Sequence, residues 1–196
     1  MRPVRLVRRD PVPGGRFLGG AAVTNNRRKI LTIKYCTLTV LFLLIYVLQS
    51  TPGLFSVLGV KPVLLIPAAI TLAMYEGEFS GGLYGLLAGM LCDLGGFAFY
   101  GLYSVLLLIL AAAAGLLTIY LMRRTLLNAL LMVLCTSTLC GLLDFYFQYG
   151  LWAYAGIGSL FLSHTLPTIV YTTVTAPLFF WIFGKLCSGF DSRINI

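Results

Sequence analysis

The sequence predicts an all-α membrane protein, a bundle of six transmembrane helices, on three observations. Of the 196 residues, 59% are hydrophobic and 10% are charged, and the mean hydropathy is +0.94, which is typical of an integral membrane protein and not of a soluble domain. The apolar residues fall into six runs. Eight of the fourteen Lys and Arg residues precede the first run, a skew typical of a cytoplasmic end rather than of a nucleic-acid-binding surface. The helices are expected over about residues 30–49, 60–75, 79–94, 104–122, 126–147 and 163–187.

The chain is expected to comprise three parts: a basic cytoplasmic tail (1–29), a membrane domain (30–187) and a short cytoplasmic C-terminal tail (188–196). The first tail is rich in Arg, Pro and Gly. It either only sets the orientation of the chain or also lies on anionic membrane lipid. The first apolar run, 30–49, is long enough to cross roughly 30 Å of hydrocarbon as a helix.

The second predicted helix is short and contains two prolines. Pro62 suits a first helical turn, and Pro67 is expected to kink the helix. The fourth helix is expected to end at Arg123 and Arg124. In the last, threonine-rich helix, prolines at positions 167 and 177 are expected to interrupt the helical path.

Glycine recurs at every fourth position from just before the third predicted helix and along it. This glycine stripe consists of Gly77, Gly81, Gly85 and Gly89, and the next position in the series is Asp93. In water each interior glycine would weaken a helix by about 0.5–1 kcal/mol relative to alanine. In lipid, small residues four apart let a second helix backbone come close. The glycine stripe therefore predicts either packing inside the bundle or docking of a helix from another membrane protein.

The distribution of basic residues predicts that both termini are cytoplasmic. With six crossings, and with Lys34 counted as part of the first tail, thirteen of the fourteen basic residues lie inside and only Lys61 lies outside. This agrees with the positive-inside rule. Five crossings, without the short second helix, would place Arg123 and Arg124 on the wrong side.

The same topology places a polar cluster near the outer face: Lys61, Asp93, Asp144 and His164. A charge in hydrocarbon costs on the order of 2.5–3.5 kcal/mol at the centre of a helix, so it needs a partner or a wet environment. We expect Lys61 to neutralise Asp93 or Asp144. Hydrogen bonds to neighbouring hydroxyls are the alternative structural role, and proton- or ion-coupled transport is the functional one.

The sequence offers no catalytic, cofactor-binding or metal site. His164 is the one histidine, and there is no Ser-His-Asp set, metal-ligand spacing or phosphate loop. The five cysteines form no C-x-x-C pair, which favours buried thiols over a disulfide framework. We therefore expect a protein that is not an enzyme and has no cofactor.

Residues 60–110 carry a family pattern. In chain order it reads Lys61-Pro62-Val63-Leu64-Leu65, Glu76-Gly77, Gly81-Gly82, Gly85-Leu86-Leu87, Gly89, Leu91, Asp93-Leu94 and Gly101-Leu102. This resembles the MreD family of bacterial rod-shape-determining proteins, which typically has Arg-Pro-Asp with a leucine run, then a glycine-rich helix that ends in Gly-Leu-x-x-Asp. Here Lys61 replaces the arginine, Val63 replaces the aspartate, and the last glycine of the motif is displaced.

The resemblance implies a non-catalytic integral membrane scaffold of the cell-elongation machinery, in the bacterial cytoplasmic (inner) membrane. Its implied partners in lateral peptidoglycan synthesis are an MreC-type protein, the MreB filament, a RodA-type glycosyltransferase and a penicillin-binding transpeptidase. The implied six-helix fold is similar to that of the substrate-binding subunits of energy-coupling-factor vitamin transporters.

Such a transporter subunit is the alternative function. These subunits share the glycine-rich helix and its acid, and they commonly carry an Ala-x-x-x-Ala stripe on the first helix. The run 30–49 contains no alanine, and the nearest such spacing is Ala69 with Ala73 in the second predicted helix.

Overall fold

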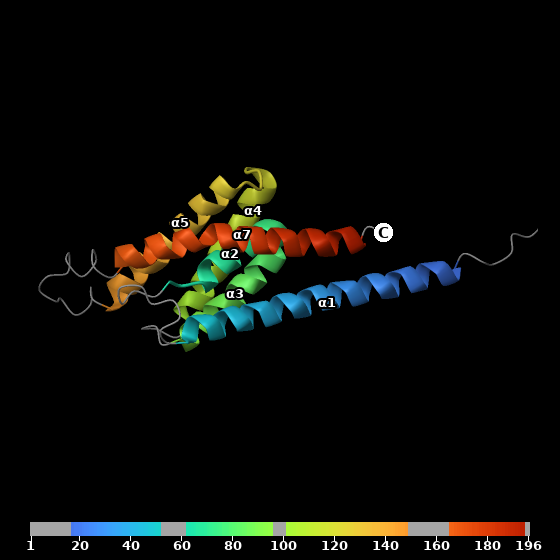
Figure 1. The fold of residues 1–196 in the computed structure, drawn as a ribbon, viewed down its shortest axis with the longest axis horizontal. Coiled ribbons are helices and arrows are strands. Elements are labelled where there is room, and N and C mark those ends of the chain that lie inside the picture. Colours follow the sequence, from blue (N-terminus) through green and yellow to red (C-terminus); the bar gives the residue numbers. More distant parts are fainter. Residues whose placement is uncertain (1–16, 52–61, 96–100, 149–164, 195–196) are drawn as a thin grey trace, which may run out of the picture.

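Helices make up nearly all of the chain that the structure describes. The structure is a computed structural model; it describes residues 17–51, 62–95, 101–148 and 165–194, with side chains from residue 28 to residue 190 of these ranges. The helices are α1 (Phe17–Ser50), α2 (Leu65–Glu76), α3 (Glu78–Leu94), α4 (Leu102–Tyr120), α5 (Leu126–Gln148) and α7 (Leu166–Ile194) (Figure 1).

Four of these helices are long and apolar enough to cross a membrane. The spans are Arg28–Ser50, Leu102–Tyr120, Leu126–Phe147 and Leu166–Phe190. The prediction of an all-α transmembrane protein is therefore confirmed. The two other helices are shorter: α2 has 12 residues and α3 has 17, or about 18 and 26 Å at the helical rise of roughly 1.5 Å per residue.

Helix α1 begins well before the predicted start at residue 30. It runs without a break from Phe17 to Ser50, because extending an existing helix requires no new nucleation. The charge count above placed Lys34 with the first tail, although position 34 falls within the predicted helix 30–49. Lys34 lies inside the Arg28–Ser50 span, and it is buried.

The prolines act differently from the prediction. Pro67 is the third residue of α2, in the first turn, where its missing N–H has no acceptor to lose. It therefore marks the start of a helix and not a kink, and Pro62 precedes that helix. Pro167 likewise falls in the first turn of α7, and α7 continues through Pro177. Membrane helices tolerate an interior proline because neighbouring groups satisfy the freed carbonyl.

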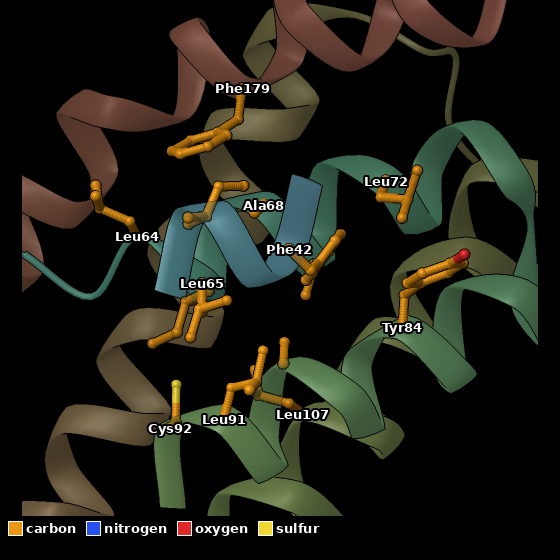
Figure 2. Packing of buried hydrophobic residues seen from close by; sticks show 14 of the residues in the cluster. Phe42, Leu64, Leu65, Ala68, Leu72, Tyr84, Leu91, Cys92, Leu107 and Phe179 are labelled. Atoms are coloured by element: carbon orange, nitrogen blue, oxygen red, sulfur yellow. The ribbon is translucent and has the colours of Figure 1, made fainter. Parts of the chain in front are cut away.

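Helix α2 forms the centre of the molecule. Every residue from Leu65 to Met74 is buried, because α1, α3, α4, α5 and α7 all contact this helix. An evenly apolar helix needs cover on all sides. Figure 2 shows the core around it, to which α1, α2, α3, α4 and α7 contribute Phe42, Leu65, Leu91, Leu107 and Phe179, among others.

The outward faces of the other helices are apolar. Large side chains are exposed on each of them, including Val40 and Val47 on α1, Leu83 and Met90 on α3, Ile109 on α4, Leu127 on α5 and Val174 on α7. A continuous apolar surface is what lipid requires of a membrane protein. It leaves the polar chemistry of the chain to the interior and to the two ends of the bundle.

Candidate functional site

The glycine stripe brings α3 into close contact with α4. A Cβ atom added to Gly85 would collide with the backbone carbonyl oxygen of Leu107, and one added to Gly89 would collide with the Cα atom of Ser104 and the carbonyl oxygen of Tyr103. Backbone atoms cannot move aside as a flexible side chain can. At these two positions the two helices approach so closely that only glycine fits.

The other two glycines of the stripe face different neighbours. A Cβ atom on Gly81 would lie 2.5 Å from the Cβ of Ala73 in α2. Gly77 connects α2 to α3 with a φ of 86°, in the left-handed region that favours glycine. An added Cβ there would lie 3.5 Å from Ile119 of α4. All four glycines thus have neighbours within the chain, and docking of a foreign helix on them stays a prediction.

Asp93 ends the stripe and caps α4. Asp93 is buried, with 5% of its surface exposed. One carboxylate oxygen accepts the backbone N–H of Tyr103 at 3.2 Å, and the other accepts the N–H of Ser104 at 3.1 Å and its hydroxyl at 2.5 Å. Gly101, the residue before α4, has no side chain to serve as a cap. The carboxylate of α3 supplies the missing acceptors, and the positive end of the α4 dipole favours its charge.

Of the other three residues of the predicted outer polar cluster, the structure describes Asp144. Lys61 and His164 fall outside the described residues, so the expected pairing of Lys61 with Asp93 or Asp144 stays a prediction. Asp144 is half-buried near the end of α5. The structure therefore connects Asp93 to α4.

A buried ion pair that the sequence did not predict lies at the other end of the bundle. The Nζ atom of Lys34 on α1 is 2.6 Å from Oε1 of Glu76, the last residue of α2, and both side chains are 7% exposed. The thiol of Cys187 on α7 donates to the same oxygen at 3.2 Å. Three helices therefore meet at one carboxylate. The signal in the sequence was a lysine inside an apolar span, because such a charge requires a counter-charge.

Further cations lie at the same end as this ion pair. The guanidinium carbon of Arg124, in the α4–α5 connection, is 5.9 Å from the centroid of the Tyr75 ring. The Tyr75 hydroxyl donates to the carbonyl of Phe180 in α7 at 3.4 Å. The Nζ atom of Lys185 on α7 lies 5.0 Å from the centroid of the Trp181 ring, one turn earlier in the same helix. Positive charges from α1, α7 and the α4–α5 connection thus gather around the junction of α2 and α3.

In the described part of the chain, the buried polar groups are satisfied by contacts with side chains and with the backbone. Within these ranges every buried side-chain nitrogen or oxygen atom has a hydrogen-bond partner. No group of three or more His, Cys, Asp or Glu residues among them could hold a metal ion. The polar contacts join helices: Asp93 joins α3 to α4, and Glu76 joins α2 to α1 and α7.

Four apolar spans around a buried central helix, with charges satisfied between helices, define a polytopic helical membrane protein. The family model described as rod shape-determining protein MreD matches residues 28–189, which cover most of the chain. The chain therefore belongs to the MreD family, and its role lies in rod-shape determination. No curated protein and no solved structure matches it.

Proposed function

We propose that this chain is a non-catalytic integral membrane scaffold of the bacterial cell-elongation machinery, acting in lateral peptidoglycan synthesis. The observation that carries the proposal is the family match over residues 28–189. Of the four spans in the described residues that are long and apolar enough to cross the membrane, it covers three entirely and the fourth up to its last residue. The geometry agrees with it, because the polar contacts described above connect helices to one another.

The partners in this proposal are an MreC-type protein, the MreB filament, a RodA-type glycosyltransferase and a penicillin-binding transpeptidase. Helical partners in the membrane would meet the exposed apolar faces of the bundle. The glycine stripe is a poorer surface for them, because Gly81, Gly85 and Gly89 already lie against α2 and α4. We therefore assign the glycine stripe to internal packing and the partners to the outer faces.

We further propose six crossings of the cytoplasmic membrane with both termini inside, an arrangement similar to that of energy-coupling-factor substrate-binding subunits. In it α2 and α3 are two short crossings that meet at Gly77 near the cytoplasmic face. The support is the gathering of cations at that end, where Lys34 pairs with Glu76 and Arg124 lies over Tyr75. Basic residues near helix ends mark the cytoplasmic side.

The proposal is tested by depletion in a rod-shaped host. Loss of the protein is expected to round the cells, and the wild-type gene is expected to restore the rods. A tagged copy should copurify with a single-span wall-synthesis protein. Rods that persist, together with lost uptake of one vitamin, would contradict the proposal and select the transporter alternative.

Orientation is tested separately with reporter fusions. Alkaline phosphatase, which is active only outside the cytoplasm, is fused after Thr125 in the α4–α5 connection and after the C-terminal Ile196. Both fusions are expected to be inactive, whereas green fluorescent protein at the same sites should fluoresce. An active phosphatase at either site would overturn the proposed topology without affecting the family assignment.

A further inference from the structure

Helix α1 contacts the rest of the bundle along one narrow stripe. Its buried residues in the described span are Lys34, Leu38, Phe42 and Ile45, whose spacing of four, four and three places them on one helix face. The remaining faces of the span are largely exposed. α1 is therefore a peripheral helix, seated on α2, α3 and α7. Figure 1 shows it along one side of the molecule, with its N-terminal part extending beyond the other helices.

The outer end of this stripe makes a polar contact with the start of α2. The side-chain oxygen Oε1 of Gln49 accepts the backbone N–H of Leu65, the first residue of α2, at 3.2 Å. Leu64, which precedes the helix, provides no side-chain cap. The first N–H groups of a helix lack acceptors within the helix, so Gln49 satisfies one of them from α1.

The inner end of the stripe makes a polar contact with the end of α2. Lys34 pairs there with Glu76, the last residue of that helix, at 2.6 Å. The C-terminal end of a helix carries a partial negative charge, so the ammonium group is favoured both by the carboxylate and by the helix dipole. α1 and α2 run antiparallel, and each end of α2 has a polar partner on α1.

The two contacts lie far apart along both helices, so together they resist a slip of α1 along α2. Lys34 and Gln49 are fifteen residues apart on α1, about 22 Å along its axis. Leu65 and Glu76 are eleven residues apart on α2, about 17 Å. A slip of α1 by one turn, about 5.4 Å, would break both contacts at once. The apolar residues between them are a weak guide, because lipid is as apolar as the facing helix and provides no hydrophobic drive for one register. Between the two contacts α1 also meets α3, where the Tyr84 hydroxyl donates to the backbone carbonyl of Tyr35 at 3.0 Å, an acceptor that every turn of a helix repeats.

We propose that α1 is held on α2 in a single register by a polar clamp, the pair of contacts Lys34–Glu76 and Gln49–Leu65. Lys34 and Gln49 are positioning residues. Their contribution lies in specificity more than in stability, since a buried ion pair can often be replaced by apolar groups at little cost, while a single buried polar group is able to fix the register of packed helices. Because α1 is continuous from Phe17 to Ser50, the clamp also fixes how far this helix extends beyond its membrane span.

The test measures the register directly. Spin labels are placed at Val47, near the outer end of α1, and at Tyr120, the last residue of α4, in a chain with the five native cysteines changed to serine. The two sites are 61% and 78% exposed, so labels there leave the core intact. Tyr120 lies at the end of the bundle that holds the Lys34–Glu76 pair, because Gly77 is close to Ile119. The line between the labels thus has a large component along α1, and pulsed electron paramagnetic resonance reads a slip as a change in distance.

The decisive variant is Lys34→Met with Glu76→Leu and Gln49→Leu, which removes the polar clamp and leaves no buried charge without a partner. We expect it to remain folded and to show a broadened distance distribution, with a second population displaced by up to about 5.4 Å, one helical turn. The charge swap Lys34→Glu with Glu76→Lys should retain the single distance. Lys185→Met and Glu78→Gln, which remove a charge outside the clamp, are the matched controls and should also keep it.

A triple variant that folds and keeps the native distance and width would overturn the proposal. So would an equal broadening in the Lys185→Met or Glu78→Gln control. If the triple variant fails to fold, the pair Lys34→Met/Glu76→Leu and the single change Gln49→Leu are measured instead, and native distributions in both of these would overturn it.

Discussion

Asp93 and Glu76 are two buried carboxylates with different partners. Asp93 receives three hydrogen bonds from the first residues of α4, whereas Glu76 lies against the ammonium group of Lys34 and the thiol of Cys187. The first arrangement uses a helix end as the counter-charge, and the second uses a side chain. Substitutions at the two acids should therefore destabilise the protein for different reasons.

Changing Asp93 to alanine should lower the free energy of unfolding by about 2–4 kcal/mol, because hydrogen bonds to a charged group are worth roughly 1.5–3 kcal/mol and a lost cap about 1 kcal/mol. Asp93→Asn should lose less, since an amide oxygen can still accept from Ser104. Thermal unfolding in detergent measures both variants. Asp144→Asn, at a half-buried acid on α5, serves as the control. An unchanged midpoint for Asp93→Ala would refute the capping role.

Changing Glu76 to glutamine should be more harmful than changing Glu78, two residues away. The first change leaves the ammonium of Lys34 buried without its counter-charge, which typically costs about 3–5 kcal/mol. Glu78 is exposed, so Glu78→Gln should leave the unfolding midpoint near that of the wild type. Adding Lys34→Met to Glu76→Gln should recover much of the loss. Equal midpoints for Glu76→Gln and Glu78→Gln would count against the buried ion pair.

At the scale of helices, the contact between α3 and α4 depends on the absence of side-chain atoms. Gly89 faces backbone atoms of Tyr103 and Ser104. Gly82, on the same helix, faces a side chain: a Cβ atom added there would lie 3.3 Å from the Cβ of Ala112. The two positions offer a matched pair, because both are glycine to alanine changes in one helix and differ only in what the new methyl group meets.

Changing Gly89 to alanine should therefore force α3 and α4 apart and lower stability by about 1–3 kcal/mol, the usual cost of overpacking. Changing Gly82 to alanine should be close to neutral, since the opposing methyl group needs to shift by a few tenths of an ångström and alanine favours the helix. Midpoints of thermal unfolding compare the two variants. A Gly89→Ala protein as stable as Gly82→Ala would show that the helices are further apart than the structure has them.

Much of the helical pattern was predictable from the sequence, and the exceptions share a physical cause. Apolar runs define α3 and α5 almost to the residue, because their ends coincide with glycine or charge. The start of α1 and the continuity of α7 through Pro177 were not predictable, since helix propagation and tertiary contacts override local propensity.

The polar contacts were harder to predict than the helices. That Asp93 is buried and needs partners followed from its place on the glycine stripe. Its partners, backbone N–H groups of α4, carry no residue-type signal and appear only in three dimensions. Lys34 and Glu76 lie 42 positions apart, and nothing local connects them. A lysine near the start of a span also gives no sign of which residue will pair with it.

At the scale of the whole molecule, the cysteines report on packing. Cys36 and Cys135 are exposed on the apolar surface, while Cys92, Cys140 and Cys187 are buried. N-ethylmaleimide, a small and membrane-permeable reagent, should add to two thiols of the folded protein in mild detergent and to five after denaturation. Intact-mass spectrometry counts the adducts, and peptide mapping assigns them. Rapid modification of Cys92 or Cys140 in the folded protein would contradict the arrangement of α3 and α5.

The short lengths of α2 and α3 also bear on how the protein is made. Each falls below the roughly 20 apolar residues that a helix needs to cross the bilayer by itself, and they are joined by Gly77 alone. We expect them to leave the translocon together, as one hairpin from Leu65 to Leu94. In the proposed topology the ribosome delivers α1 first, so Lys34 would already lie within the bilayer when Glu76 arrives. The order of synthesis thus gives the carboxylate its counter-charge at the moment of insertion.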